Sequence, residues 1–313
     1  MDPAADSSYV MITEARRRGY TPWMVELAGL SLAGTETWAR ATPIGLGEIS
    51  RDRPSAPPRM QALGPARPRA AESFRAIVMR KDPPFDQDYL TATWWLDRAA
   101  LRTVVVNAPA GLRELSEKLS ILPFPELTPR TYMLRARDDL RAALRELGGR
   151  MILKPLYGHG GRGVLIAREG DANLNTLLEL ATEEGRAWTI AQEFVPAASA
   201  GDKRILLIEG EPVGAVLRVP AKGELRNNFH VGGTPSATGL TARDLEICAA
   251  VGPYLRARGM LFVGIDVLGD YLTEINVTSP TGMQEINRLG GLTGDATMQA
   301  KFWDALERRV AEA

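Results

Sequence analysis

A lysine followed by a cluster of glycines is the feature of this sequence that most directly indicates chemistry. Lys154 ends a short apolar run, and four of the next nine residues are glycines. Glycines allow a backbone to approach an oxyanion closely, and a nearby ammonium group supplies the opposite charge. The segment therefore predicts a phosphate-binding loop, although an ordinary glycine-rich hairpin would have the same composition.

The residues after this loop separate it from other phosphate-binding motifs. Residues 164–167 are apolar and predict a strand, so the loop joins two strands. A dinucleotide fingerprint requires a helix at this point, and a Walker loop ends in Gly-Lys-Ser/Thr rather than in Gly163-Val164. The His-Arg-Asp and Asp-Phe-Gly segments of protein kinases are absent. The order of lysine, glycine loop and strand favours a lid that folds over a nucleotide triphosphate.

A predicted hairpin over residues 261–276 carries a second group of polar side chains. Glu274 and Asn276 are two residues apart and share one face of their strand. Asp266 shares that face if the hairpin loop has three residues, which puts residue 266 opposite 272, whereas a two-residue loop turns it away. Oxygen donors without histidine or thiolate favour a hard cation, and Mg²⁺ bridging triphosphate oxygens fits best. A solvated polar strand face is the alternative.

Two arginines lie on the predicted strands between these motifs. Arg204 and Arg218 stand on either side of a Glu-Gly-Glu-Pro turn at residues 209–212, and their planar guanidinium groups could clamp phosphates. The predicted strand that ends in residues 192–195 could offer main-chain groups to an adenine edge, but taken alone it is simply a strand.

The predicted order of elements gives an α/β region followed by an α+β region. Strands alternate with helices up to about residue 118, which implies a parallel sheet with Arg80 and Asp82 at the carboxyl end of a strand. Later strands are mostly antiparallel. The proline- and arginine-rich segment 39–69 is expected to be a loose surface excursion or a short strand with long loops. The other elements are expected at 6–18 (helix), 23–27, 76–79, 89–98 (helix), 103–107, 137–147 (helix), 173–184 (helix), 188–194, 204–208, 213–219 and 241–258 (helix).

Composition narrows the function classes. The chain has 313 residues, and 38 basic residues balance 38 acidic ones, which argues against nucleic acid as the main partner. Its one cysteine, Cys248, excludes an internal disulfide framework. The N-terminus does not resemble a signal peptide, and no run of eighteen apolar residues lacks a charge, so a soluble cytoplasmic protein is expected with no membrane partner.

Taken together, the motifs resemble those of the bacterial glutathione synthetase family, which has the ATP-grasp fold, over nearly the whole chain. The resemblance is carried by Met-Arg-Lys-Asp-Pro-Pro-Phe-Asp (79–86), Glu-Lys-Leu (117–119), Ile-Leu-Lys-Pro-Leu (152–156), Gly-Asp-Lys-Arg (201–204), Arg-x-Asn-x-x-x-Gly-Gly (226–233), Phe-Val-Gly-x-Asp (262–266) and Leu-Thr-Glu-Ile-Asn-Val-Thr-Ser-Pro-Thr (272–281). It implies an N-terminal α/β domain at 1–118 that precedes an ATP-grasp unit at 119–313. This unit would comprise a central lid subdomain, 119–194, with its glycine-rich loop at 157–164, and a metal and phosphate subdomain, 195–313.

The resemblance also implies roles for individual residues. Lys118 and Lys154 would contact ATP phosphates, and Asp202 would approach the ribose. Arg80, Asp82 and Ser279 would help to seat the substrates. The loop over the phosphates would comprise Gly158, His159, Gly160, Gly161, Arg162 and Gly163, and the adenine would be held by Gln192, Glu193, Phe194 and Val195. Two Mg²⁺ ions, or Mn²⁺ in their place, would be held by Asp266, Glu274 and Asn276, while Arg218, Arg226 and Asn228 would face the phosphate and the developing acyl phosphate.

The implied reaction joins γ-glutamylcysteine to glycine through an acyl phosphate, with release of ADP and phosphate, in a homo-oligomer that the family makes a tetramer. Another ATP-grasp carboxylate–amine ligase is the first alternative. The second is an impaired ATP-binding homologue, because the family opens with an apolar strand before Met-Asp-Pro, whereas this chain begins at Met1-Asp2-Pro3. Without that strand, a gap or an uncovered edge is expected in the first parallel sheet.

Overall fold

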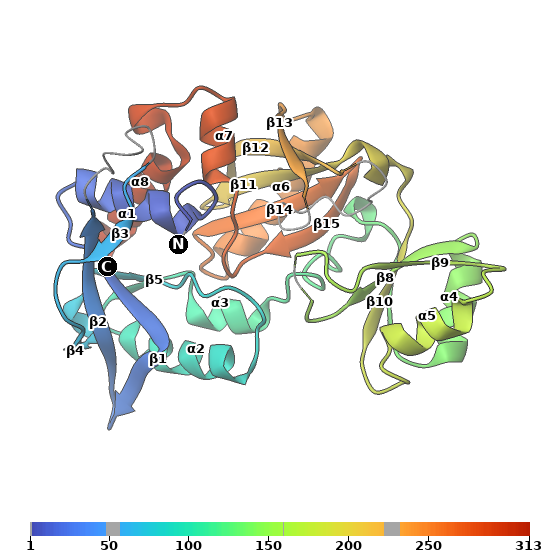
Figure 1. The fold of residues 1–313 in the computed structure, drawn as a ribbon, viewed down its shortest axis with the longest axis horizontal. Helices are drawn as coiled ribbons and strands as arrows, with labels where there is room; N and C mark the ends of the chain where they lie inside the picture. Colours follow the sequence, from blue (N-terminus) through green and yellow to red (C-terminus); the bar gives the residue numbers. More distant parts are fainter. Residues whose placement is uncertain (1, 48–56, 159, 222–231) are drawn as a thin grey trace.

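The computed structural model describes residues 2–47, 57–158, 160–221 and 232–313. His159, Arg226 and Asn228, three of the predicted site residues, lie outside these ranges. Figure 1 shows a five-stranded sheet near the middle of the long axis, a long hairpin at one end and a small lobe at the other. Within the described ranges, no helix is long and apolar enough to cross a membrane.

The N-terminal region combines a parallel pair of strands with an antiparallel sheet. Strands β5 (Ala76–Val78) and β6 (Val104–Val106) pair in parallel, which confirms the α/β prediction for this part. The helices are α1 (Ser7–Arg17), α2 (Gln87–Ala99) and α3 (Pro109–Glu114). The antiparallel sheet contains β1 (Trp23–Ala33), β2 (Glu36–Leu46), β3 (Met60–Ala62) and β4 (Arg67–Ala70).

This antiparallel sheet corrects the prediction for residues 39–69. The segment was expected to hold at most one short strand, but it contains most of β2 together with β3 and nearly all of β4. Strand β2 has a buried side: Ala39 and Ala41 are 3% and 0% exposed, respectively. Pro68 lies on the edge strand β4, where a strand tolerates a missing hydrogen-bond donor. Proline content therefore misled the prediction here.

The small lobe carries the glycine-rich loop. Its antiparallel strands run in the order β7 (Thr131–Leu134), β10 (Thr189–Glu193), β8 (Arg150–Pro155) and β9 (Leu165–Arg168). Helices α4 (Arg137–Glu146) and α5 (Leu174–Ala181) cover one face, where Met151 and Leu153 are fully buried. The loop joins β8 to β9 directly, so the predicted strand–loop–strand unit is confirmed. Lys154 alternates with the buried residues and points to the face without helices.

The middle sheet has the order β13 (Thr234–Ala237), β12 (Glu211–Val219), β11 (Asp202–Ile208), β14 (Phe262–Leu268) and β15 (Tyr271–Asn276). One face packs apolar residues such as Ile205 and Ile265 against α6 (Ala242–Arg256), α2 and α3. The other face packs Leu206 and Phe262 against α7 (Met283–Leu289) and α8 (Met298–Glu312). The remainder of this second face carries charged side chains. Helices α7 and α8 were not predicted.

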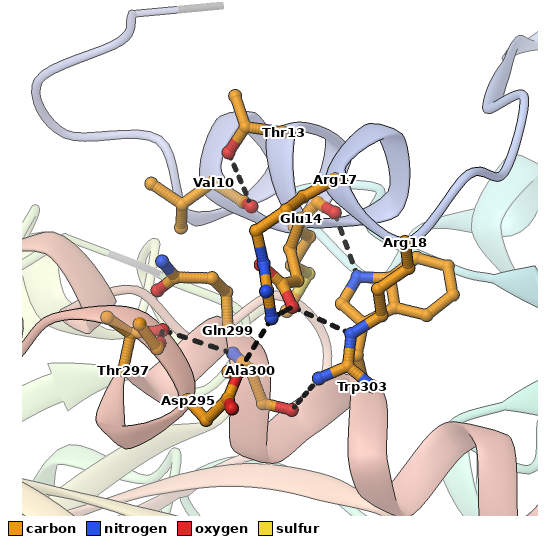
Figure 2. A network of polar contacts seen from close by, with 12 residues as sticks. Val10, Thr13, Glu14, Arg17, Arg18, Asp295, Thr297, Gln299, Ala300 and Trp303 are labelled. Atoms are coloured by element: carbon orange, nitrogen blue, oxygen red, sulfur yellow. Dashed lines mark hydrogen bonds and ion pairs between the residues drawn. The ribbon is translucent and has the colours of Figure 1, made fainter.

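A network of hydrogen bonds and ion pairs holds α1 against α8, and Figure 2 shows part of it around Glu14, Arg18 and Ala300. Glu14 is 5% exposed and accepts hydrogen bonds from Arg17 at 2.8 Å and from Arg18 at 2.7 Å. Arg18 also reaches Asp304 at 2.7 Å and Glu307 at 2.6 Å on α8. The hydrogen bonds from Arg17 and the charges of both arginines lower the pKa of Glu14 despite its burial. The two helices come from opposite ends of the chain, so this network fastens the N-terminal region to the C-terminal one.

We expect Glu14→Gln to lower the free energy of unfolding by about 1–3 kcal/mol, because the buried network loses a charged acceptor. The folded-state pKa of Glu14 lies below its unfolded value of about 4.3, so its contribution is present above that value and is lost as the pH falls through the folded pKa. Denaturant unfolding from pH 6 to pH 3 measures this. A variant whose stability falls with acid as steeply as the wild type would contradict the assignment; Glu312→Gln, at the exposed end of α8, is the control.

Candidate active site

A row of charged residues crosses one face of the middle sheet. Asp202 pairs in register with Arg218 on β12, and Arg204 pairs with Asp266 on β14. Asp266 lies opposite Glu274 on β15. Because directly opposite residues in an antiparallel pair project to the same side, all five side chains share one face. Four strands thus bring together the residues that the sequence predicted as phosphate, ribose and metal contacts.

Asp266 is the centre of this row. Its side chain is 3% exposed; one oxygen accepts from Arg204 Nε at 2.5 Å, and the other accepts from Arg204 Nη2 at 3.0 Å. Arg218 Nη2 lies 2.9 Å from the second oxygen, and Arg218 Nε donates to Asp202 at 2.8 Å. Burial alone would raise the pKa of Asp266, but the two guanidinium groups outweigh it and hold this pKa well below its usual range. The carboxylate is therefore ionised throughout the physiological range.

The hairpin register differs from the predicted one, although the predicted face is correct. Leu268 pairs with Tyr271, so the loop has two residues and not three. A two-residue loop alone would turn Asp266 away from Glu274, as the sequence analysis noted. A β-bulge compensates: Val267 pairs with Leu272 and Asp266 pairs with Glu274, which leaves Thr273 as the extra residue. The hydroxyl of this extra residue, Thr273 Oγ1, donates a hydrogen bond to the Asp266 carbonyl at 3.1 Å and so binds the bulge to the neighbouring strand.

The oxygen donors of the hairpin fit a hard divalent cation. Asp266 and Glu274 are neighbours across the two strands, and Asn276 Nδ2 lies 3.2 Å from an Asp266 oxygen. Rotation of the Asn276 amide by half a turn would present its carbonyl oxygen instead. Two carboxylates and one amide oxygen, with no sulfur or imidazole, are the donors that Mg²⁺ and Mn²⁺ take. In the described ranges, no group of three or more His, Cys, Asp or Glu residues is placed to hold a metal ion, so the amide is needed to complete the set.

Two lysines lie near this charged face. Lys154 belongs to the small lobe, and Lys118 belongs to the linker between α3 and that lobe. Lys118 Nζ donates to the carbonyl oxygen of Gly158 in the glycine-rich loop. Helix α3 ends at Glu114, and Lys118 lies in a turn of the linker that follows it. Lys154 Nζ donates to Gln192 Oε1 at 2.9 Å. Burial lowers the pKa of Lys154, and the charges that oppose this effect include those of Glu274, Asp266 and Asp202. The Lys154 ammonium group on the lobe therefore faces the carboxylates of the sheet.

The glycine-rich loop adopts conformations that favour glycine. Gly160, Gly161 and Gly163 have φ values of 62°, 74° and 71°. A Cβ on Gly163 would lie 2.6 Å from the Pro155 ring. Arg162 is exposed, and Gly158 carries the carbonyl that accepts from Lys118.

The adenine-binding segment predicted from the sequence begins at the end of β10. Gln192 is 4% exposed, and its amide bridges Lys154 and Thr131 Oγ1. The backbone of Gln192 and Glu193 pairs with β8, so main-chain groups for a ligand would come from Phe194 and Val195. The Glu193 side chain pairs with Arg130 at the surface, and Arg150 stacks on the Phe194 ring at 3.3 Å from its centroid.

A second polar cluster surrounds Arg80, just beyond β5. Its Nη2 donates to the Pro280 carbonyl at 3.0 Å and its Nε to Ser8 Oγ at 3.3 Å. Its Nη1 is buried and makes no hydrogen bond within the described residues. Burial lowers the pKa of Arg80 to about 10. Asp82 accepts from Ser279 Oγ at 2.8 Å. The structure thus brings together the three predicted substrate residues, one of them with an unused buried donor.

Several residues of this region were missed by the sequence analysis. Glu117 accepts from Thr278 Oγ1 at 2.7 Å, and burial raises its pKa. Glu285 on α7 is 8% exposed, its Oε2 has no hydrogen-bond partner among the described residues, and burial raises its pKa too. Ser8 was missed because it is far from Arg80 in the sequence. Only Glu117 had a signal, since it belongs to the Glu-Lys-Leu motif that was quoted for its lysine.

A lysine-bearing hairpin lobe that faces an acidic and arginine-rich antiparallel sheet defines an ATP-grasp protein. A solved ATP-grasp structure has a similar fold. The RimK-domain ATP-grasp protein from Sphaerobacter thermophilus superimposes with a TM-score of 0.58 at 20% identity, covering 95% of each chain. At that identity the likeness establishes the fold alone.

The chain belongs to the prokaryotic glutathione synthetase family. The family model for the N-terminal domain matches residues 1–113, and the model for the ATP-grasp domain matches residues 117–291. Glutathione synthetase from Agrobacterium fabrum is 42% identical over 98% of this chain and 92% of its own length. The enzyme from Synechococcus elongatus is 44% identical over 96% of this chain and 94% of its own length.

Gly264 tests the packing beneath the charged row. A Cβ there would lie 2.9 Å from Pro280 Cβ and 3.0 Å from Arg204 Cδ, so both neighbours would have to move. We expect Gly264→Ala to lower the free energy of unfolding by about 1–3 kcal/mol through overpacking. Denaturant unfolding measures this, with Gly239→Ala, which would meet no atom within 4 Å, as the matched control. Equal stability of the two variants would show that Arg204 and Pro280 are free to shift.

Proposed function

We propose that this chain catalyses the ATP-dependent ligation of γ-glutamylcysteine and glycine to glutathione, releasing ADP and phosphate. The observation that carries the proposal is the row from Asp202 to Glu274, faced by Lys118 and Lys154. Anionic phosphates need cations, and a metal needs carboxylates; this face offers both side by side. Membership of the glutathione synthetase family supports the choice of substrates.

We propose the following division of work. Residues 1–118 form a substrate-side domain, residues 119–194 a lid and residues 195–313 the metal and phosphate subdomain. Lys118 and Lys154 hold ATP phosphates beneath the loop from Gly158 to Gly163. The adenine lies against the segment from Gln192 to Val195. The remaining roles are taken by Asp202 for the ribose, by Arg204, Arg218, Arg226 and Asn228 for phosphate and acyl phosphate, and by Arg80, Asp82 and Ser279 for the substrates.

Asp266, Glu274 and Asn276 would hold two Mg²⁺ ions, with Mn²⁺ as an alternative. When bound, the metal supplies charge neutralisation for the phosphoryl group that is transferred. Arg204 and Arg218 occupy the Asp266 oxygens in the structure, so these guanidinium groups must share or leave the carboxylate when a cation arrives. The same guanidinium groups are then available to phosphate oxygens, for which their planar donors are suited.

The chemistry follows from placing reactants side by side. A carboxylate oxygen of the dipeptide attacks the γ-phosphorus of ATP, ADP leaves, and an acyl phosphate forms. The glycine amine then attacks the acyl carbon, loses a proton, and expels phosphate. Most of the acceleration comes from positioning and from fixed positive charge around the transferring group. An acyl phosphate hydrolyses readily, so closure of the glycine-rich loop serves to exclude water.

Product analysis with single omissions tests the proposal directly. ADP release is measured with γ-glutamylcysteine, glycine, ATP and Mg²⁺ together, and then with each one left out. We expect turnover only in the complete mixture, with glutathione as the product. Nucleotide binding without turnover in the complete mixture would contradict the proposed reaction while leaving the nucleotide site intact.

We further propose that the protein is a cytoplasmic homo-oligomer, a tetramer by family resemblance. Light scattering after size-exclusion chromatography tests the number of subunits.

Glu274→Ala should reduce turnover at least a hundredfold, because the proposed metal set loses one of its two carboxylates. Steady-state ADP release as a function of Mg²⁺ concentration is the measurement. Glu246→Ala removes a carboxylate from the exposed surface of α6 and serves as the control. Turnover of Glu274→Ala close to that of the control would remove the metal assignment.

Arg80→Ala should raise the KM for γ-glutamylcysteine about tenfold to a hundredfold and leave the KM for ATP unchanged. A charged hydrogen bond from the unused Nη1 to a substrate carboxylate accounts for an effect of this size. Initial rates with each substrate varied in turn give the two constants. Arg102→Ala, whose side chain is exposed and pairs only weakly with Glu72 at 3.4 Å, is the control. An equal rise in both KM values would indicate general distortion and not substrate contact.

A further inference from the structure

We propose that Glu117 is a positioning residue that fixes Lys118 relative to the strand carrying Glu274 and Asn276. The inference rests on the proposed function, since Lys118 is taken as a phosphate contact and Glu274 as a metal ligand. It concerns a residue to which the proposed function gives no role. Glu117 acts through its neighbours and touches neither the nucleotide nor the metal in this proposal.

The backbone and side chain of Glu117 both bind the end of β15. The Glu117 carbonyl accepts from the Ile275 N–H at 2.8 Å. Its Oε1 accepts from Thr278 Oγ1 at 2.7 Å and from the Thr278 N–H at 3.4 Å. Thr278 is 5% exposed, so its hydroxyl depends on this partner. One residue of the linker is thus held at two points along the strand and the turn that follows it.

The two points lie next to the proposed metal ligands on β15. Ile275 lies between Glu274 and Asn276, and Thr278 begins the turn that leads to Ser279. On the other side, the next residue of the linker is Lys118, whose ammonium reaches the Gly158 carbonyl in the glycine-rich loop. Glu117 therefore joins three parts that a triphosphate would touch at once: the lysine, the lid and the metal strand. Ground-state alignment of such parts governs phosphoryl transfer.

The Thr278 contact requires an acceptor oxygen and not a charge. Glutamine keeps that oxygen in the same place, whereas alanine removes it. A role as proton acceptor would be lost in both variants, since an amide cannot take up the proton of the attacking amine. Comparison of Glu117→Gln with Glu117→Ala therefore separates positioning from acid–base chemistry.

The experiment measures binding of Mg²⁺ with a non-hydrolysable ATP analogue by calorimetry, together with kcat and thermal unfolding. We expect Glu117→Ala to weaken nucleotide binding about tenfold and lower kcat, and Glu117→Gln to stay within about twofold of the wild type. Thr278→Val should weaken binding like Glu117→Ala, Thr278→Ser should not, and the double variant Glu117→Ala/Thr278→Val should be no weaker than either single one.

Glu14→Ala is the matched control, because Glu14 is also a glutamate whose carboxylate accepts side-chain hydrogen bonds, in the network between α1 and α8. It should lower the unfolding temperature and leave nucleotide affinity unchanged. Wild-type affinity in Glu117→Ala, or impairment of Glu117→Gln equal to that of Glu117→Ala, would overturn the inference. Lys118→Ala separates the two proposals: it must weaken binding if the proposed function holds, and normal binding in that variant would overturn the proposed function itself.

Discussion

The bidentate contact between Arg204 and Asp266 is the interaction on which the arrangement of the site depends. A carboxylate almost fully removed from water is stable only with a partner, and Asp266 has two guanidinium groups within 3.0 Å. Each of these arginines comes from a different strand, β11 or β12, so the contact also fixes how those strands present their side chains. The charged face is thus held together by the groups that would act on the substrate.

This arrangement lowers the stability that the sheet gains from packing. Charged side chains take the part of the sheet surface that would otherwise pack against an apolar helix, as Leu206 and Phe262 do beside α7 and α8. Stability has to come from elsewhere, and the fully buried residues of the opposite face, such as Ile205 and Ile265, supply it. One face of the sheet consequently serves stability. On the other face, the part beside α7 and α8 also serves stability, and the remaining part carries the charged side chains of the candidate site.

The sequence was sufficient for the strand–loop–strand unit, because glycines, a lysine and a flanking apolar run are local signals. It was sufficient for the face shared by Glu274 and Asn276, because residues two apart in a strand always project together. It could not give the register of the hairpin, since the bulge at Thr273 depends on packing between two strands. It missed α7 and α8, and it misread 39–69, where a buried alternation in β2 was hidden among prolines. The contacts of Arg80 with Ser8 and Pro280 join distant parts of the chain, and no local sequence pattern predicts them.

The bulge at Thr273 has a consequence for how such chains can change over generations. If Thr273 were removed, a two-residue connection with regular pairing would still place Glu274 opposite Asp266, so the side chains beyond it would keep their face. If Thr273 stayed and the strands paired without a bulge, Asp266 would pair with Thr273, and Glu274 would turn to the opposite face. Homologous hairpins that are shorter by this one residue should therefore lack the bulge, and hairpins of the same length should have either the bulge or a three-residue connection.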